Sequence, residues 1–201
     1  MPLTFRRARP TDVDAAIPLI YSSGPDAFDY AFARPGRSSA TDFLRHAFLQ
    51  GSGQFGWRQH WVGEQDGQVL AAGTAFGGEV NLGYMLAATR QILGYFGLAS
   101  PAVMVRGLQL ERIICPPPRR TLYLAHLGVA PERRGEGLGS QLIDHFLHCG
   151  RHAGLPMAAL DVSVANPRAQ ALYERLGFSV QVERPSTLPG VASHRYMQRP
   201  L

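Results

Sequence analysis

Leu127-Gly128-Val129-Ala130-Pro131-Glu132-Arg133-Arg134-Gly135-Glu136-Gly137-Leu138-Gly139-Ser140 is the stretch that decides the fold. The end of an apolar strand runs through a turn into a helix. Alternate glycines let backbone N–H groups converge with no Cβ between them. A helix N-terminus adds unpaired donors and partial positive charge, and Arg133 and Arg134 add bidentate donors. This pattern predicts a pyrophosphate-binding loop, with glycines used only for packing as the alternative.

Two familiar phosphate loops do not fit this stretch. All 20 basic residues are arginine, and a Walker loop requires a lysine, as does Schiff-base chemistry. A dinucleotide loop needs GxGxxG directly after a strand, with an acidic residue about twenty positions on. Asp161 is available, but the spacing is GxGxG and Pro131–Arg134 separates the glycines from the strand.

Other elements follow from local signals on both sides of this stretch. Leu3–Arg9 resembles a strand, and Pro10-Thr11-Asp12 opens a helix that ends at Ser22–Pro25. Gln65-Asp66-Gly67-Gln68 predicts a hairpin turn between strands at Trp57–Glu64 and Val69–Phe76. The interrupted periodicity of Val80–Ile114 predicts two helices or one broken helix.

Arg134-x-x-Gly137-x-Gly139, following Leu127-x-Val129-x-Pro131, resembles the coenzyme A pyrophosphate motif of the GNAT N-acetyltransferase superfamily. Asn166, Ala169 and Leu172-Tyr173-Glu174-Arg175-Leu176-Gly177-Phe178 are similar to that family's following helix and strand start. The opening, Phe5 to Asp12, also fits the family. The motif-level resemblance is strong from Leu122 to Val182 and loose elsewhere.

This resemblance implies an α/β fold with a mixed, mostly antiparallel central sheet. The sheet would splay at the cofactor strand and be flanked by helices. A chain of 201 residues is long enough for one sizeable core. We therefore expect a single N-acetyltransferase-like domain over residues 1–201, with a helical insertion around 80–118.

The resemblance also implies acetyl-CoA as the acyl donor and assigns residues to it. The backbone of Leu127 and Val129 would pair with the pantetheine, and Asn166 would support the cofactor or the neighbouring strand. Tyr173 would protonate the departing thiolate. The pyrophosphate would be held by N–H groups of the loop residues Arg134, Gly135, Gly137, Gly139 and Ser140.

Tyrosine suits the acid role because its ordinary pKa of about 10 lies above that of a thiol, about 8.5. The alternative for Tyr173 is an aromatic core residue with a satisfied hydroxyl. For the general base, the strand offers Tyr123 and His126 and no carboxylate; the alternatives are a base reached through water and a purely structural role for His126. Strict alternation places Tyr123 on one face with Leu127 and His126 on the other, unless a β-bulge reverses it.

A second constellation, His145, His148, Cys149 and His152, has spacings that could gather metal ligands. The apolar side of that helix runs through Leu142, Phe146 and Ala153. We therefore favour a solvated face for the three histidines and expect no metal.

Composition limits the partners. The net charge of +5 and pI of 9.7 suit an anionic ligand, but the arginines are scattered and form no nucleic-acid arm. We expect a small-molecule or peptide amine as acceptor, no nucleic-acid partner, and leave a homodimer open. The acceptor side would be lined by N-terminal residues that could equally pack a loop: Asp26, Phe28, Asp29, Tyr30 and Phe32.

Two cysteines, Cys115 and Cys149, form no disulfide framework, and the N-terminus lacks a signal-peptide pattern. The longest apolar tract, Gln91–Val105, is too short to cross a membrane. We expect a cytoplasmic protein without a membrane partner. The predicted function is an acetyl-CoA-dependent N-acyltransferase; the alternative is a non-catalytic acyl-CoA sensor of the same fold.

Overall fold

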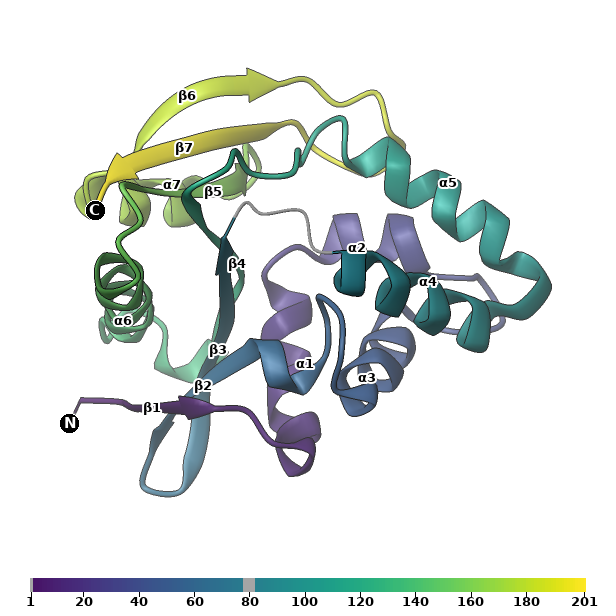
Figure 1. Cartoon of the computed structure of the whole chain (residues 1–201), viewed down its shortest axis with the longest axis horizontal. Helices are drawn as coiled ribbons and strands as arrows, with labels where there is room; N and C mark the ends of the chain where they lie inside the picture. Colours follow the sequence, from purple (N-terminus) through teal and green to yellow (C-terminus); the bar gives the residue numbers. More distant parts are fainter. Residues whose placement is uncertain (1, 78–81) are drawn as a thin grey trace.

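The structure is a computed structural model of the chain and describes residues 2–77 and 82–201. Its centre is a seven-stranded sheet in the order β1-β2-β3-β4-β5-β7-β6 (Figure 1). Among the strand pairs within these ranges only β4–β5 is parallel, so the predicted mixed, mostly antiparallel sheet is confirmed. The strands are β1 (Thr4–Arg7), β2 (His60–Gln65), β3 (Gln68–Gly77), β4 (Thr121–Val129), β5 (Met157–Ser163), β6 (Ser179–Arg184) and β7 (His194–Pro200).

Helices cover both faces of this sheet (Figure 1). On one face lie α1 (Val13–Ser22), α2 (Pro25–Phe32) and α3 (Ala40–Gln50), and on the other lie α6 (Leu138–His152) and α7 (Pro167–Arg175). The sides are fixed by contacts at β3 and β2: a Cβ on Gly73 of β3 would touch Leu142 and Phe146 of α6, whereas Phe48 of α3 packs on His60 of β2.

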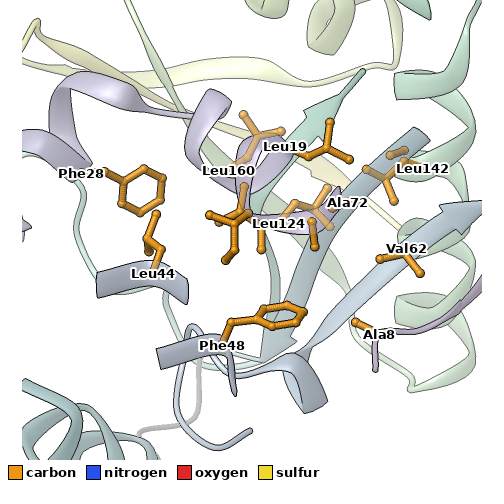
Figure 2. Close-up of a cluster of buried hydrophobic side chains, with 14 of the residues drawn as sticks. Ala8, Leu19, Phe28, Leu44, Phe48, Val62, Ala72, Leu124, Leu142 and Leu160 are labelled. Atoms are coloured by element: carbon orange, nitrogen blue, oxygen red, sulfur yellow. The ribbon is translucent and has the colours of Figure 1, made fainter. Parts of the chain in front are cut away.

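The core fills the space between these helices and the central strands. Figure 2 shows Phe28 of α2 together with Leu44 and Phe48 of α3, and it shows Leu142 of α6 beyond Ala72 of β3. Each is at most 9% exposed. Complete burial of one such large apolar side chain stabilises the fold by about 1.5–3 kcal/mol.

The predicted hairpin is present between β2 and β3. Asp66 and Gly67 adopt φ values of 52° and 75°, which a two-residue turn with positive φ at both positions requires. Asp and Gly tolerate this conformation better than other residues. The local sequence therefore determined the turn and the two pairs beside it, Gln65 with Gln68 and Glu64 with Val69. Beyond these pairs the register shifts between Glu64 and Gly63.

Two other segments refine the sequence-based expectations. Residues 25–32 form helix α2, with Pro25 in its first turn and Phe28 and Phe32 buried, so the alternative that these residues pack a loop is wrong. The segment predicted as an insertion holds two helices, α4 (Leu82–Phe96) and α5 (Ser100–Leu110), joined by a short 3₁₀ turn. Its first two residues, Val80 and Asn81, lie outside the described residues.

The sheet opens between β4 and β5. Pairing is limited to Thr121, Leu122 and Tyr123 with Met157, Ala158 and Ala159. Beyond this point β4 remains paired with β3 as far as Val129, and β5 with β7 as far as Ser163. The predicted splay beside the cofactor strand is therefore present.

A close backbone approach holds α1 against the open half of β4. A Cβ on Gly128 would lie 2.0 Å from the Leu19 carbonyl oxygen and 2.6 Å from its carbon. Both atoms belong to a helix backbone, so neither can rotate away. Glycine is therefore required at position 128 for packing.

Gly128→Ala should destabilise the protein by about 1–3 kcal/mol or more, because overpacking displaces α1 from the sheet. Denaturant unfolding measures this loss. Gly77→Ala is the matched control, since no atom of the described residues lies within 4 Å of its added Cβ, and should change stability by at most about 1 kcal/mol. Equal stability of the two variants would contradict this packing.

Candidate active site

The open half of β4 presents backbone groups that no strand of the described residues pairs. The Ala130 N–H donates to the Leu70 carbonyl on β3 at 2.9 Å. Because N–H directions alternate along a strand, the Val129 N–H points to the opposite edge, toward β5. There the two strands have parted, so this edge can accept an added extended chain. Leu127 and Val129, predicted from the sequence, both belong to it.

A β-bulge interrupts this strand at His126. Ala72 pairs with Gly128 and Thr74 with Ala125, so His126 and Leu127 together stand opposite Gly73. His126 adopts φ of 57°, an uncommon conformation for a residue other than glycine.

The bulge corrects the predicted faces of β4. Leu127 points to the α6 face, where its Cδ2 would lie 2.9 Å from a Cβ on Gly73. Tyr123 points to the other face, because its neighbour Leu122 packs against Gly150 of α6. His126 is also on that other face, in ring contact with Phe28 of α2. The expectation that Tyr123 shares a face with Leu127 is therefore wrong. The exception stated for this strand applies instead, because a β-bulge reverses the alternation at His126.

The glycine loop follows β4 directly. Gly135 and Gly137 have φ values of 97° and 80°, so both use conformations that favour glycine. The first bond into α6 runs from the Gln141 N–H to the Gly137 carbonyl, 3.1 Å. The N–H groups of residues 138–140 therefore lack intrahelical acceptors and remain available to an anion.

Gly139 has a different part in the loop. Its added Cβ would lie 3.3 Å from Leu172 Cδ2 of α7 and 3.7 Å from Val129 Cγ2. Gly139 thus lets the start of α6 pack closely against β4 and α7. The packing alternative applies to this glycine, while no atom of the described residues lies within 4 Å of a Cβ on Gly137.

Arginines flank the loop, but not the pair expected from the sequence. Arg133 is ion-paired with Glu136 at 2.8 Å and hydrogen-bonded to Gln65. Arg134 donates from Nε to the Val129 carbonyl at 3.4 Å, and a Cβ on Gly135 would lie 3.6 Å from Arg168 Nη2. Within the described residues, neither Arg134 nor Arg168 contacts a carboxylate, so both guanidinium groups are available for an anion. Sequence reasoning missed Arg168, which carries no local signal.

Asn166 lies where β5 gives way to α7. Its side-chain oxygen accepts from the Ala169 N–H at 3.1 Å, so it caps the helix. It also lines a pocket of about 250 Å³ between the α1–α2 connection, the end of β5 and the segment before β7. Other residues lining this pocket are Ser22, Asp26, Ser163 and His194. Asp26, one of the N-terminal candidates, therefore borders an open cavity.

Tyr173 is a largely buried residue of α7. Its ring packs edge-on against Phe178, with centroids 6.2 Å apart. Burial raises the pKa of Tyr173 to about 12, so the phenol is protonated at neutral pH. Its hydroxyl has no hydrogen-bond partner among the residues that the structure describes. The ring fits the core alternative, but the hydroxyl is not satisfied there.

Tyr123 and His126, the candidate bases, differ in their surroundings. The Tyr123 hydroxyl donates to Asp161 Oδ2 at 2.8 Å, and Arg184 pairs with the other carboxylate oxygen. Burial, together with the Asp161 charge, raises the pKa of Tyr123 well above 10. Burial and the neighbouring His60 lower the pKa of His126 well below 6.5, so its imidazole is neutral at pH 7.

Burial also raises the pKa of Asp161 to about 6, against the effect of its bond from Tyr123. Asp161, which the dinucleotide alternative would have used, thus lies on β5 in a buried polar cluster. Among the described residues its hydrogen bonds and ion pair are with Tyr123 and Arg184, and none is with the glycine loop.

The histidines of α6 are split between two environments. His145 stacks on Phe5, with centroids 4.6 Å apart, and lies edge-on to Trp61, so its expected solvated position is wrong. His148 and His152 are exposed and adjacent to each other. Over residues 2–77 and 82–201, no group of three or more His, Cys, Asp or Glu side chains is arranged to hold a metal.

Comparison with known proteins identifies the family. Residues 36–178, well over half of the chain, match the acetyltransferase (GNAT) family. The chain therefore belongs to this family, and the resemblance deduced from the glycine loop and the α7 motif is confirmed.

Several relatives align with part of the chain. The 5-NmdU N-acetyltransferase of Pseudomonas phage PaMx11 is 38% identical over 90 residues, which cover 45% of this chain and 61% of the relative. The N-alpha-acetyltransferase 40 of Saccharomyces cerevisiae is 30% identical over 131 residues, covering 62% and 43% respectively. The chain thus spans less than two thirds of the length of each.

Solved structures share the fold at low sequence identity. An N-acetyltransferase from Staphylococcus aureus Mu50 superposes with a TM-score of 0.68 at 15% identity, covering 98% of this chain and 100% of that one. The ribosomal-protein-S18-alanine N-acetyltransferase of Escherichia coli gives 0.55 at 20% identity, covering 98% and 93%. As for membranes, none of the helices in the described ranges has the length and apolar character needed to span one.

Arg134→Gln and Arg168→Gln should each weaken acetyl-CoA binding about three- to tenfold, because each removes a charged donor beside the loop. Titration calorimetry at low and high salt measures the effect, which salt should reduce. Arg133→Gln is the control, since Arg133 is already paired with Glu136. An equal or larger loss in the control would contradict this assignment.

Proposed function

We propose that the protein is an acetyl-CoA-dependent N-acyltransferase that moves an acetyl group directly to the amine of a small molecule or peptide. The observation that carries the proposal is the unpaired edge of β4 leading into a loop of free N–H groups. A ligand made of an extended amide chain that ends in a pyrophosphate would match both parts: its amides could pair with the strand edge, and its phosphate oxygens could accept from the loop N–H groups. Family membership supports the same reaction class.

The cofactor residues divide along this path. Leu127 and Val129 would offer backbone groups to the amides of the pantetheine arm. The loop from Arg134 to Ser140, aided by Arg168, would hold the pyrophosphate. When bound, acetyl-CoA supplies an activated acyl group as a thioester. A Cβ built on Gly137 would have no atom of the described residues within 4 Å, which leaves the space that phosphate oxygens need.

The transfer requires one proton acceptor and one proton donor. A carbon–nitrogen bond forms as the carbon–sulfur bond breaks, so the amine loses a proton and the thiolate gains one. Tyr173 suits the donor, since its hydroxyl is protonated and has no hydrogen-bond partner among the described residues. No acyl-enzyme is involved, and no metal takes part.

His126 is the better candidate for the acceptor of the amine proton. The lowered pKa of His126 keeps its imidazole neutral at pH 7. A neutral imidazole has a lone pair that can accept a proton. Tyr123 would have to ionise before it could act, and its raised pKa and its bond to Asp161 oppose that. We therefore assign Tyr123 only a structural role, on the same face of the sheet as His126.

The acceptor amine would approach from the pocket beside Asn166. Asp26 and His194 supply polar groups there, and the burial of His194 lowers its pKa, so it is neutral. The relatives differ in the acceptors that their names give, 5-NmdU in one and an N-alpha group in another. The proposal therefore stays at the level of an amine. Two free thiols, Cys115 and Cys149, support a cytoplasmic location.

The test is release of free thiol from acetyl-CoA across a panel of amines, for wild type and Tyr173→Phe. Wild type should release thiol with at least one amine. Tyr173→Phe keeps the ring and deletes the proton, so kcat should fall about 10²- to 10⁴-fold. Its acetyl-CoA dissociation constant should change far less, because one neutral hydrogen bond contributes about 0.5–1.5 kcal/mol.

The pattern of results also separates the alternatives. Tight acetyl-CoA binding without turnover on any amine would favour the sensor. Near-wild-type kcat in Tyr173→Phe, with a lowered melting temperature, would make Tyr173 a core residue only. Absence of any acetyl-CoA binding would contradict the proposal as a whole.

A further inference from the structure

Two histidines from different strands meet at the bulge of β4. His60 begins β2 and is completely buried, and its Nε2 lies 3.1 Å from His126 Nδ1. The other His60 nitrogen, Nδ1, lies 3.0 Å from the Gly56 carbonyl oxygen. The two rings are nearly coplanar, at 13°, with centroids 5.3 Å apart. A chain of hydrogen bonds thus runs from a backbone carbonyl through both rings.

The carbonyl at one end determines where every proton of this chain lies. A carbonyl oxygen only accepts, so His60 Nδ1 must carry a hydrogen. Burial lowers the pKa of His60 to about 4, so the ring is neutral and its Nε2 has a lone pair. That lone pair accepts from His126 Nδ1–H. Since His126 is also neutral, its Nε2 is left without a proton.

We infer that His60 is a positioning residue that fixes the tautomer of His126 and so keeps His126 Nε2 as a proton acceptor. This inference rests on the proposed function, in which His126 receives the proton of the acceptor amine. Without His60, the neutral ring of His126 could carry its proton on either nitrogen. Only one of the two tautomers offers a lone pair at Nε2.

Packing holds His126 in this orientation. Phe55 stacks on its ring at 5.2 Å and 17°, and Phe28 packs against it at 5.7 Å. The positive φ of the bulge turns the side chain toward β2 rather than toward α6. A residue held in an uncommon conformation persists only where its surroundings over-determine it.

The charge environment keeps both rings neutral. Within the described part of the chain, no carboxylate or arginine is hydrogen-bonded or ion-paired to either ring. The charged groups on the packed elements are engaged or directed elsewhere: Asp14 with Arg45, Asp29 with Tyr21, Glu64 with Arg6, Arg58 over Trp57, and Asp26 at the pocket of His194. His46 lies against Tyr95.

The pH dependence of the activity follows from the lowered pKa values of the two histidines. The pKa values of His60 and His126 lie below 6.5, so both rings stay neutral on the alkaline side of that value. As pH falls through the lowered pKa, His126 Nε2 takes a proton and can no longer accept one. The acid limb of kcat/KM should therefore lie below the ordinary histidine pKa of about 6.5.

The experiment compares His60→Gln with His60→Leu. The Gln side chain can place an acceptor oxygen near the former Nε2, whereas Leu is of similar size without an acceptor. His60→Leu should lower kcat about tenfold or more, toward the level of His126→Gln, whose loss should be about 10²- to 10⁴-fold. His60→Gln should lose less than about threefold. The double variant His60→Leu/His126→Gln should lose no more than His126→Gln alone.

Nitrogen-15 NMR of the histidine side chains gives a readout independent of activity. In wild type, the His126 resonances, assigned by their loss in His126→Gln, should show Nδ1 protonated and Nε2 unprotonated. In His60→Leu the two tautomers should mix, and the acid limb of kcat/KM should move. A purely structural role would change the melting temperature equally in both His60 variants and leave the tautomer unchanged.

Three results would overturn the inference: a protonated Nε2 on His126 in wild type, equal kcat losses in the Gln and Leu variants, or a further loss in the double variant. If His60→Leu fails to fold, the wild-type tautomer and the His60→Gln comparison still decide. Failure of the proposed function has a different signature, namely no thiol release by wild type with any amine, whatever the tautomer of His126.

Discussion

The rest of the structure depends on the hydrogen bonding of β4, because backbone N–H and C=O groups must find hydrogen-bond partners. Along the first part of β4 these partners come from β3 on one side and β5 on the other. After Tyr123 the β5 side is lost, because β5 follows β7 instead. The remaining edge of β4 is available to a ligand, and the loop after it, with Gly135 and Gly137 at positive φ, extends the same set of free donors.

The two proton-transfer groups would then act from opposite faces of the sheet. Tyr173 comes from α7, which contacts the start of α6 through Leu172 and Gly139. His126 reaches the α1–α3 face because the bulge reverses its direction. The thiol leaving group and the incoming amine also need separate approaches to the thioester carbon. Under the proposed function, the opening of the sheet and the bulge would together meet this need.

Local signals made part of this arrangement predictable. The Asp66-Gly67 turn and the glycine loop depend on conformations that few residues adopt, so the sequence indicates them directly. The face of His126 was not predictable, because the bulge arises where β4 pairs with β3 and α1 approaches Gly128. Arg168 and His60 were missed for the same reason: each gains its place through contacts between elements distant in the chain. The helix at residues 25–32 was missed because its aromatic residues fit a loop equally well.

The central claim is that a ligand chain completes the edge of β4. Amide hydrogen exchange at Leu127 and Val129, with and without acetyl-CoA, tests it most directly. We predict that saturating acetyl-CoA slows exchange at these two amides and in the loop from Gly135 to Ser140, while exchange at the exposed β6 amides is unchanged. Binding of acetyl-CoA that leaves Leu127 and Val129 exchanging at their original rates would contradict the account.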